Sequence, residues 1–502
     1  MAKAYIGGLQ MNGTSDEPSD YVVYGLKMDE WDSANTTFSG ISQYVSKVNI
    51  PSGVTTFGED ALKGYGVESF EIPTGVTTLG KGALRGMTNL KSITIPSSVQ
   101  SMGQQLFAGD TSLSSITFNN SFSQVPDLFF SGCTALSGVT LPQDIWEMGK
   151  GIFKDCTSLV THTMPEYFDV MDAGSESDPG MFEGCTSLTG VTWGEYAPRM
   201  LPANMFKGCT SFVQSSGPIG KWAYRGCTSL TSFTLGDYDI NNVEGAFRDS
   251  GLKNVTFTRS TSCTSSGNMN FQQIYLGKDM FYGCQELSAV TVSADTSQCD
   301  CGSPCLWAFD GVEENCFLGN RKLTSLPLPI ISNIGEGAFQ GCTAMTSVSL
   351  SGGTKIEKFA FGNCGLTSIA TPSTMVSICE GAFQGCPLTA ITFNEGLKYL
   401  GTQMFGNFMA KDTCLVTAVT IPSTVIDMSY NGDYGTVFDY WRRLKEVTML
   451  PTVPPSVLAF EISPSYHPTL THIYVPAESV DAYKAATNWS VYANIIEAIP
   501  AT

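Results

Sequence analysis

Apolar residues alternate with small polar residues in short segments that recur along most of the chain. Leu90–Pro96, Leu136–Pro142 and Leu388–Phe393 each show this alternation and are rich in β-branched residues. A period of two residues with β-branched enrichment predicts a short, half-buried strand. A proline directly after the segment has no backbone N–H to donate, so it ends strand pairing there.

Each predicted strand is followed by a second apolar pair and then by an aromatic residue next to glycine. Val76–Gly80 and Ile356–Phe359 are examples of the apolar pair, and the phrase Gly-Ala-Phe-Gln-Gly-Cys stands at both Gly337–Cys342 and Gly381–Cys386. We expect the aromatic ring to point inward, because a segment this rich in glycine turns the chain back toward the next strand.

This whole pattern repeats at a nearly fixed period. Cys133 and Cys156 stand 23 residues apart, and Cys342, Cys364 and Cys386 follow one another at steps of 22 residues. Such a period indicates stacked repeats, because one repeat cannot bury its own apolar side and packs against its neighbours. We predict a repeat solenoid, an array of short parallel β-strands with about sixteen coils and terminal caps.

The repeated residues carry a resemblance to a known family. The pattern Ile/Leu-Gly-x-x-Ala-Phe-x-Gly-Cys-x-x-Leu-x-x-Val-x-Leu-Pro-x-x-Val resembles the BspA-like leucine-rich repeat family over residues 48–475. The resemblance implies a leucine-rich-repeat solenoid in a surface or secreted protein that binds host matrix, other cells or proteins. It supplies no catalytic residues that could be carried over to this chain.

We expect three parts along the chain. Residues 1–47 lack the repeat and are expected to form an N-terminal cap or attachment segment, whereas residues 48–475 form the solenoid. Residues 476–502 are expected to form a C-terminal cap with a short helix, because Pro476 and the acidic residues that follow it favour a first helical turn. A solenoid needs caps because its terminal coils would otherwise expose apolar surface.

Charge and hydropathy limit which partners and which cellular location we expect for the protein. The formal net charge of −19 argues against nucleic acid and against an anionic membrane as partners. No run of about 18 apolar residues predicts a transmembrane helix, and Met1–Leu9 lacks the apolar core of a secretory signal. We therefore expect a virion protein, a tail or head fibre or a decoration protein of a bacteriophage. The alternative is an exported bacterial cell-surface adhesin of the BspA-like type, so the expected location is the virion or the extracellular cell surface.

The polar strand positions predict a continuous binding face. Seven threonines occupy the same strand position in different repeats and are the candidate binding-face residues: Thr94, Thr117, Thr140, Thr192, Thr234, Thr392 and Thr420. We expect a recognition or adhesion protein that binds a protein or glycan on a cell surface, with many weak contacts adding up by avidity. Residues 1–47 are the expected contact for a second copy or for a virion partner.

Catalytic chemistry is not indicated. The chain has 3 histidines and no G-x-S-x-G or H-E-x-x-H motif. We predict that the protein is not an enzyme and has no catalytic residues and no cofactor. The acidic segment Met171–Pro179 interrupts the period and is expected to be a solvated loop, since its spacing does not match a calcium-binding loop.

The cysteines fall into two groups. The cysteine that recurs in each repeat is expected to be a buried free thiol that acts as a small apolar side chain. Cys299, Cys301, Cys305 and Cys316 instead lie within 18 residues of one another. A zinc site, two disulfides and four reduced thiols all stay open for this second group, although C-x-C-x₃-C is not a standard zinc spacing.

Overall fold

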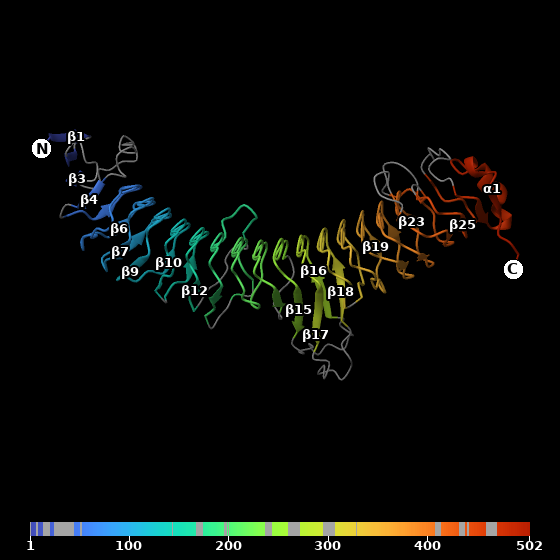
Figure 1. The fold of residues 1–502 in the computed structure, drawn as a ribbon, viewed down its shortest axis with the longest axis horizontal. Coiled ribbons are helices and arrows are strands. Elements are labelled where there is room, and N and C mark those ends of the chain that lie inside the picture. The colour runs from blue at the N-terminus through green and yellow to red at the C-terminus, as the bar shows by residue number, and fades with distance from the viewer. Residues whose placement is uncertain are drawn as a thin grey trace. The chain divides into compact units, whose positions relative to one another are not determined.

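The computed structural model describes most of the repeat region. The described residues are 2–6, 9–13, 21–24, 45–50, 53–142, 144–166, 174–194, 198, 200–235, 243–259, 272–294, 307–327, 329–406, 413–430, 437–438, 441–457 and 469–501. They divide into two compact units, a first unit within Met1–Leu230 and a second unit within Thr231–Thr502, and Figure 1 follows both from blue to red.

The beginning of the first unit differs from the repeats in how its strands pair. A four-stranded sheet has the order β1-β2-β3-β4, formed by Ala2–Ile6, Leu9–Gly13, Tyr21–Tyr24 and Val45–Asn49. The pairs β1-β2 and β2-β3 are antiparallel, whereas β3-β4 is parallel. The parallel pairing that characterises the repeats therefore begins at β4.

The rest of the first unit consists of coils, many of which contribute short strands to one or both of two rows of parallel strands. Strands of the first row are β7 (Ser92–Ile95), β9 (Ser115–Phe118), β12 (Thr161–Thr163) and β13 (Gly190–Thr192). Strands of the second row are β5 (Thr56–Phe57), β6 (Thr78–Leu79), β8 (Ser101–Met102), β10 (Gln124–Val125) and β11 (Glu147–Met148). Every pairing within these rows is parallel and joins coils that follow one another in the chain.

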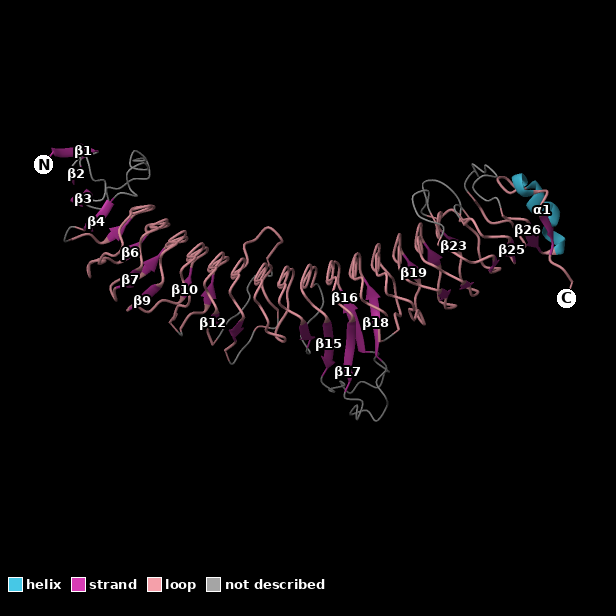
Figure 2. Cartoon of the chain, viewed as in Figure 1, coloured by secondary structure: helices cyan, strands magenta, loops and turns pink. Residues whose placement is uncertain are grey.

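The second unit repeats the same two rows, and its longest strands, β15, β17 and β18, have 6 residues each. Its first row contains β14 (Ser232–Leu235), β15 (Asn254–Arg259), β17 (Ala289–Ala294), β20 (Ser368–Ala370), β22 (Ala390–Thr392), β24 (Ala418–Ile421), β25 (Glu446–Met449), β26 (His472–Val475) and β27 (Ile496–Ala498). Its second row contains β16 (Gln272–Leu276), β18 (Trp307–Val312), β19 (Lys355–Ile356), β21 (Ser377–Ile378) and β23 (Tyr399–Leu400). Figure 2 shows these strands as magenta arrows separated by long pink loops.

Helical structure in the described chain lies near residue 480. The 3₁₀ turns Ala477–Ser479 and Ser490–Tyr492 flank α1, which spans Val480–Ala485. Tyr483 and Trp489 are buried there, with their ring centroids 5.1 Å apart in an edge-to-face arrangement. Both polar ends are satisfied, since the Tyr483 hydroxyl donates to the carbonyl of Pro451 and the Trp489 indole N–H donates to the carbonyl of Pro455, each at 2.9 Å.

A column of phenylalanine rings runs through the core of each unit. In the first unit Phe130, Phe153 and Phe182 follow one another with centroids 5.5 and 5.3 Å apart and interplanar angles of 10° and 7°. In the second unit Phe339 and Phe361 are 5.2 Å apart and parallel. In these coils one ring is stacked on the ring of the next coil, whereas Leu62 and Leu84 are the buried counterparts in the first coils. Each coil thus buries its apolar side against a neighbour, which confirms the repeat solenoid.

The recurring cysteine stands beside this column. The Cys133 thiol donates to the carbonyl oxygen of Phe107 at 3.1 Å, and the Cys156 thiol donates to that of Phe130 at the same distance. All cysteines of the described chain are free and buried. Burial raises the pKa of Cys185 to about 12, so these thiols stay protonated and act as apolar side chains with one weak donor.

A glycine precedes this cysteine because the backbone is left-handed there. Gly132 has a φ of 77°, which favours glycine. A Cβ atom added at Gly132 would also lie 3.5 Å from the Cα of Gly109 in the neighbouring coil. That distance is an ordinary van der Waals contact, so the left-handed backbone is what favours glycine at this step.

Candidate functional site

The candidate threonines of the first unit line the solvent face of its first-row strands. Thr94 in β7 lies directly opposite Thr117 in β9, and Thr192 in β13 lies directly opposite Thr163 in β12. All four are exposed, whereas the residue before Thr94, Ile93, is buried. Strand alternation causes this, because successive side chains point to opposite faces of a sheet.

The second unit carries the same row. Thr234 in β14 lies opposite Thr256 in β15, which in turn lies opposite Thr291 in β17. The Oγ1 atoms of Thr256 and Thr291 are 2.8 Å apart, so the two hydroxyls form a hydrogen bond along the row. Thr392 and Thr420 are exposed on β22 and β24.

Four threonines of this row were missed by the sequence pattern. Thr163, Thr256, Thr291 and Thr448 are in register with the predicted residues. Insertions between the repeats change the step from one threonine to the next, and His162 breaks the apolar alternation that would have marked Thr163. We call the predicted and the added residues together the threonine row.

Thr140 differs from the rest of the row because its coil forms no first-row strand. The predicted strand Leu136–Pro142 is therefore wrong as a hydrogen-bonded strand, although Thr140 is exposed as expected. Thr140 borders an open hollow of ≈ 530 Å³ that spans residues of three successive coils, from Ser114 to Thr163.

Missing backbone hydrogen bonds create this hollow. On one side, the Ser114 N–H donates to the carbonyl of Lys91 at 3.0 Å, and on the other side the Thr189 N–H donates to the carbonyl of Val160 at 2.9 Å. Within the described chain, the backbone of residues 137–141 makes no hydrogen bond to either neighbouring coil. Gly138 favours this break, because glycine weakens a strand interior and leaves no side chain to pack.

The lining of the hollow is uncharged. Hydroxyl groups come from Ser114, Ser115, Thr140, Thr161 and Thr163, and apolar side chains come from Ile116, Val139 and Leu141. Ile116 and Val139 are half-buried, whereas their counterparts Ile93 and Val191 in the neighbouring coils are buried. The hollow therefore combines hydroxyls with partly exposed aliphatic surface.

His162 also borders the hollow but belongs to the core. Its ring lies 4.7 Å from the ring of Phe153 and 5.6 Å from that of Phe182, measured between centroids. Burial lowers the pKa of His162 to about 4, and its Nε2 atom has no hydrogen-bond partner in the described chain. The neutral imidazole thus packs between two phenylalanine rings as part of the core.

The second group of cysteines is only partly visible. Cys299, Cys301 and Cys305 lie outside the described residues. Cys316 is a free thiol buried in the core, and burial raises its pKa well above the usual range. Among the residues that the structure describes, no group of three or more His, Cys, Asp and Glu side chains is arranged to hold a metal ion.

A loop of the first unit is fixed by a buried asparagine. Asn204 is fully buried, and its side-chain amide nitrogen donates to the carbonyls of Ser175, Glu176 and Asp178 at 3.3, 3.1 and 3.0 Å. Three hydrogen bonds to one side chain hold this part of the acidic insertion against the coil that follows it.

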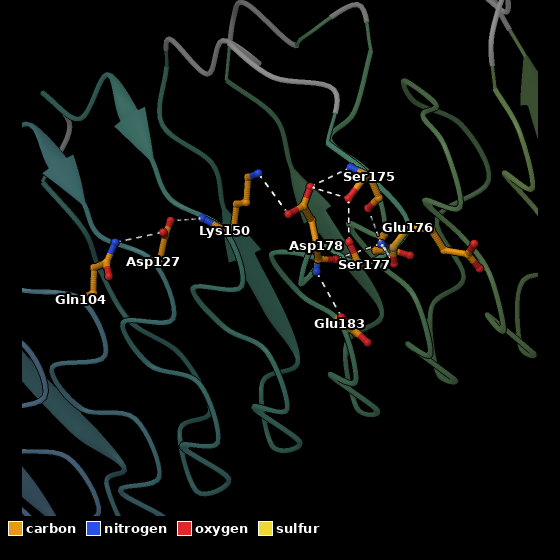
Figure 3. A network of polar contacts seen from close by, with 10 residues as sticks. Gln104, Asp127, Lys150, Ser175, Glu176, Ser177, Asp178 and Glu183 are labelled. Atoms are coloured by element: carbon orange, nitrogen blue, oxygen red, sulfur yellow. Dashed lines mark hydrogen bonds and ion pairs between the residues drawn. The ribbon is translucent and has the colours of Figure 1, made fainter.

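The charges of the same loop connect neighbouring coils, as Figure 3 shows. Asp178 forms an ion pair of 3.2 Å with the Lys150 ammonium group, and the Lys150 backbone N–H donates to Asp127 at 2.7 Å. Gln104 extends the series with a hydrogen bond of 3.1 Å to Asp127. The Ser175 N–H and Lys150 lower the pKa of Asp178, so its carboxylate is held in a tie between coils.

These features define a leucine-rich-repeat solenoid: two rows of parallel strands, a core of stacked phenylalanine rings, and an exposed row of hydroxyls. A family model described as the BspA type leucine-rich repeat region matches residues 34–137, 178–273, 200–300, 310–432 and 354–452. These ranges cover more than half of the chain, and the chain belongs to this family. No curated protein matches it.

Several solved structures are similar in fold. A leucine-rich repeat protein from Bacteroides ovatus is 19% identical with a TM-score of 0.46, over 89% of this chain and 94% of that one. One from Eubacterium ventriosum is 16% identical with a TM-score of 0.35, over 75% of this chain and 92% of that one. The leucine-rich repeat protein of T. pallidum is 22% identical with a TM-score of 0.29, over 36% of this chain and 86% of that one.

None of the helices in the described part of the chain is both long enough and apolar enough to cross a bilayer.

Proposed function

We propose that this protein is a non-enzymatic recognition or adhesion protein that binds proteins or glycans of a cell surface through the threonine row. The observation that carries the proposal is the register of the row, since Thr94 pairs with Thr117, Thr163 with Thr192, and Thr256 with Thr291. Aligned, exposed hydroxyls offer the same short-range hydrogen bonds at each coil that carries a threonine, whereas Ala370 stands opposite Thr392 in the row. Many such weak contacts add up to useful affinity, above all when several copies are displayed together.

The proposal extends to where the protein acts. We propose display on a bacteriophage particle as a tail or head fibre or a decoration protein, with residues 1–47 as the attachment segment, residues 48–475 as the binding solenoid and residues 476–502 as its cap. An exported bacterial adhesin is the second candidate, and membership of the BspA type family favours it.

The threonine row is tested by adding charge to it. Thr140→Lys and Thr192→Lys each place a long ammonium side chain on an exposed position. We expect partner binding to fall by about tenfold or more, because a complementary surface must now desolvate that charge. Binding to host cells is measured by flow cytometry with the labelled full-length protein.

The matched control is Gln100→Lys, which adds the same charge at an exposed position beside the second row. It should leave binding unchanged, and none of the three variants should change the melting temperature, because exposed substitutions alter stability little. Unaltered binding by Thr140→Lys and Thr192→Lys, with both proteins folded, would place the binding site elsewhere, in the loops.

A further inference from the structure

The hollow around Thr140 contains hydrogen-bonding groups that the protein itself leaves unpaired. Within the described chain, the backbone N–H and C=O groups of Gly138, Val139 and Thr140 make no hydrogen bond. Gly138 and Thr140 are exposed and Val139 is half-buried, so these backbone groups face solvent and can pair with water or with a ligand. The coil between β9 and β12 thus leaves donors and acceptors available to a bound molecule.

Hydroxyls above the same coil are also unpaired. Ser115, Thr140, Thr161 and Thr163 have side chains without a hydrogen-bond partner in the described chain, whereas the Ser114 hydroxyl donates to the carbonyl of Lys91 at 3.2 Å. Each free hydroxyl can both donate and accept, so together they match a ligand that carries many hydroxyls of its own.

Charge and apolar surface narrow the ligand further. The chain has a net charge of −19, yet no charged side chain lines the hollow. A charged ligand would find no countercharge there and would lose hydration. The half-buried side chains of Ile116 and Val139 add an aliphatic patch among the hydroxyls.

We propose that this hollow binds an uncharged oligosaccharide. The inference rests on the proposed function, and it names the ligand class for one part of the threonine row. A neutral sugar ring presents hydroxyls around its edge and C–H groups on its faces, which suits the hydroxyls and the aliphatic patch. A volume of ≈ 530 Å³ lies within the range of specific ligand sites.

Gly138 allows a direct test because it leaves open space in the lining. A Cβ atom added there would have no heavy atom within 4 Å, and its backbone is not in the left-handed region. Gly138→Leu therefore adds an apolar side chain to the lining without a clash at its Cβ atom. Thr140→Val removes one hydroxyl and keeps the shape. The control is Ser92→Leu, since Ser92 has the equivalent register in β7 but does not line the hollow.

The probes are cellohexaose, laminarihexaose and mannohexaose, titrated calorimetrically into the full-length protein. A hexagalacturonate and an uncharged threonine-rich hexapeptide serve as charged and peptide comparisons. We expect at least one neutral hexasaccharide to bind, with affinity reduced about tenfold or more by Gly138→Leu, severalfold by Thr140→Val and not by Ser92→Leu.

The outcomes separate this inference from the proposed function. Host-cell binding that is lost in Thr192→Lys but kept in Gly138→Leu, with no neutral hexasaccharide bound, would overturn the oligosaccharide site and leave the threonine row in place. Preferential binding of the hexapeptide or the hexagalacturonate in the hollow would also overturn it. If every variant keeps its binding to host cells, the proposed function itself is contradicted.

Discussion

His162 is the residue of the first unit that fits its position least well. The equivalent inward positions hold Ile93, Ile116, Val139 and Val191, all aliphatic. His162 packs between Phe153 and Phe182, and its Nε2 atom is left without a partner. A buried polar atom without a hydrogen bond costs stability, and protonating it in place would cost more.

This residue makes stability depend on pH. Burial lowers the pKa of His162 from its ordinary value of 6.5 to about 4, so between these values the unfolded chain binds a proton that the folded chain does not. Stability is therefore full above pH ~6.5 and is lost as the pH falls toward ~4, by up to ~3 kcal/mol.

His162→Ile should remove that dependence, because isoleucine already fills the same position in Ile93 and Ile116. We expect the variant to melt at a higher temperature than the natural protein, with a gap that widens as the pH falls from about 7 to about 5. Thermal unfolding followed by circular dichroism at several pH values measures it. A gap that stays constant with pH would show that His162 does not titrate as its burial requires.

At the scale of one coil, three interactions with the neighbouring coil recur: the stacking of the rings, the hydrogen bond of the thiol and the pairing of the short strands. The Cys364 thiol donates to the carbonyl of Phe339 at 3.0 Å, and the Cys386 thiol donates to that of Phe361 at 3.1 Å. In this way each thiol satisfies the buried carbonyl of a core phenylalanine in the preceding coil. Asp110 stands in the same column and accepts a hydrogen bond from the Met87 N–H at 2.8 Å, so the column can change its chemistry and still join two coils.

Phe361 tests how strongly one coil depends on its neighbours. Its ring is stacked at 5.2 Å on Phe339 and at 5.6 Å on Phe383. Phe361→Ala should cost about 3–5 kcal/mol, because the cavity removes contacts with both rings. Chemical denaturation measures the loss, and Thr367→Ala, an exposed change a few residues further on, should cost little. Equal stability of the two variants would contradict a continuous ring stack.

Sequence predicts the elements better than their pairing. Alternation places Leu90–Pro96 correctly, and β7 lies within it, but the same alternation in Leu136–Pro142 forms no strand. The pattern shows which side chains face the core. Whether two coils come within hydrogen-bonding distance depends on residues such as Gly138, and no periodicity reports that. For the same reason the threonine row was predictable, whereas the hollow at Thr140 was not.

For the molecule as a whole, composition and structure favour binding to a partner through uncharged groups. The net charge of −19 gives the chain an acidic character, while the threonine row consists of uncharged hydroxyls. The boundaries at residues 47 and 475 and the number of about sixteen coils stay predictions, because several connecting segments lie outside the described residues.

The location of the protein can be tested directly. Antibodies raised against the purified protein should label bacteriophage particles in immunogold electron microscopy, since the proposal assigns residues 1–47 to attachment on a virion. Preimmune serum is the control. Labelling of intact bacterial surfaces, with none on particles, would establish the adhesin alternative and contradict virion display.

The identical sequence motifs at Gly337–Cys342 and Gly381–Cys386 have a consequence for the evolution of such a chain. Both motifs lie at the same point of a coil. Recombination between their coding sequences would therefore delete or duplicate whole coils and leave the packing between the remaining coils intact. The number of coils can thus change during evolution without the need for a new packing surface.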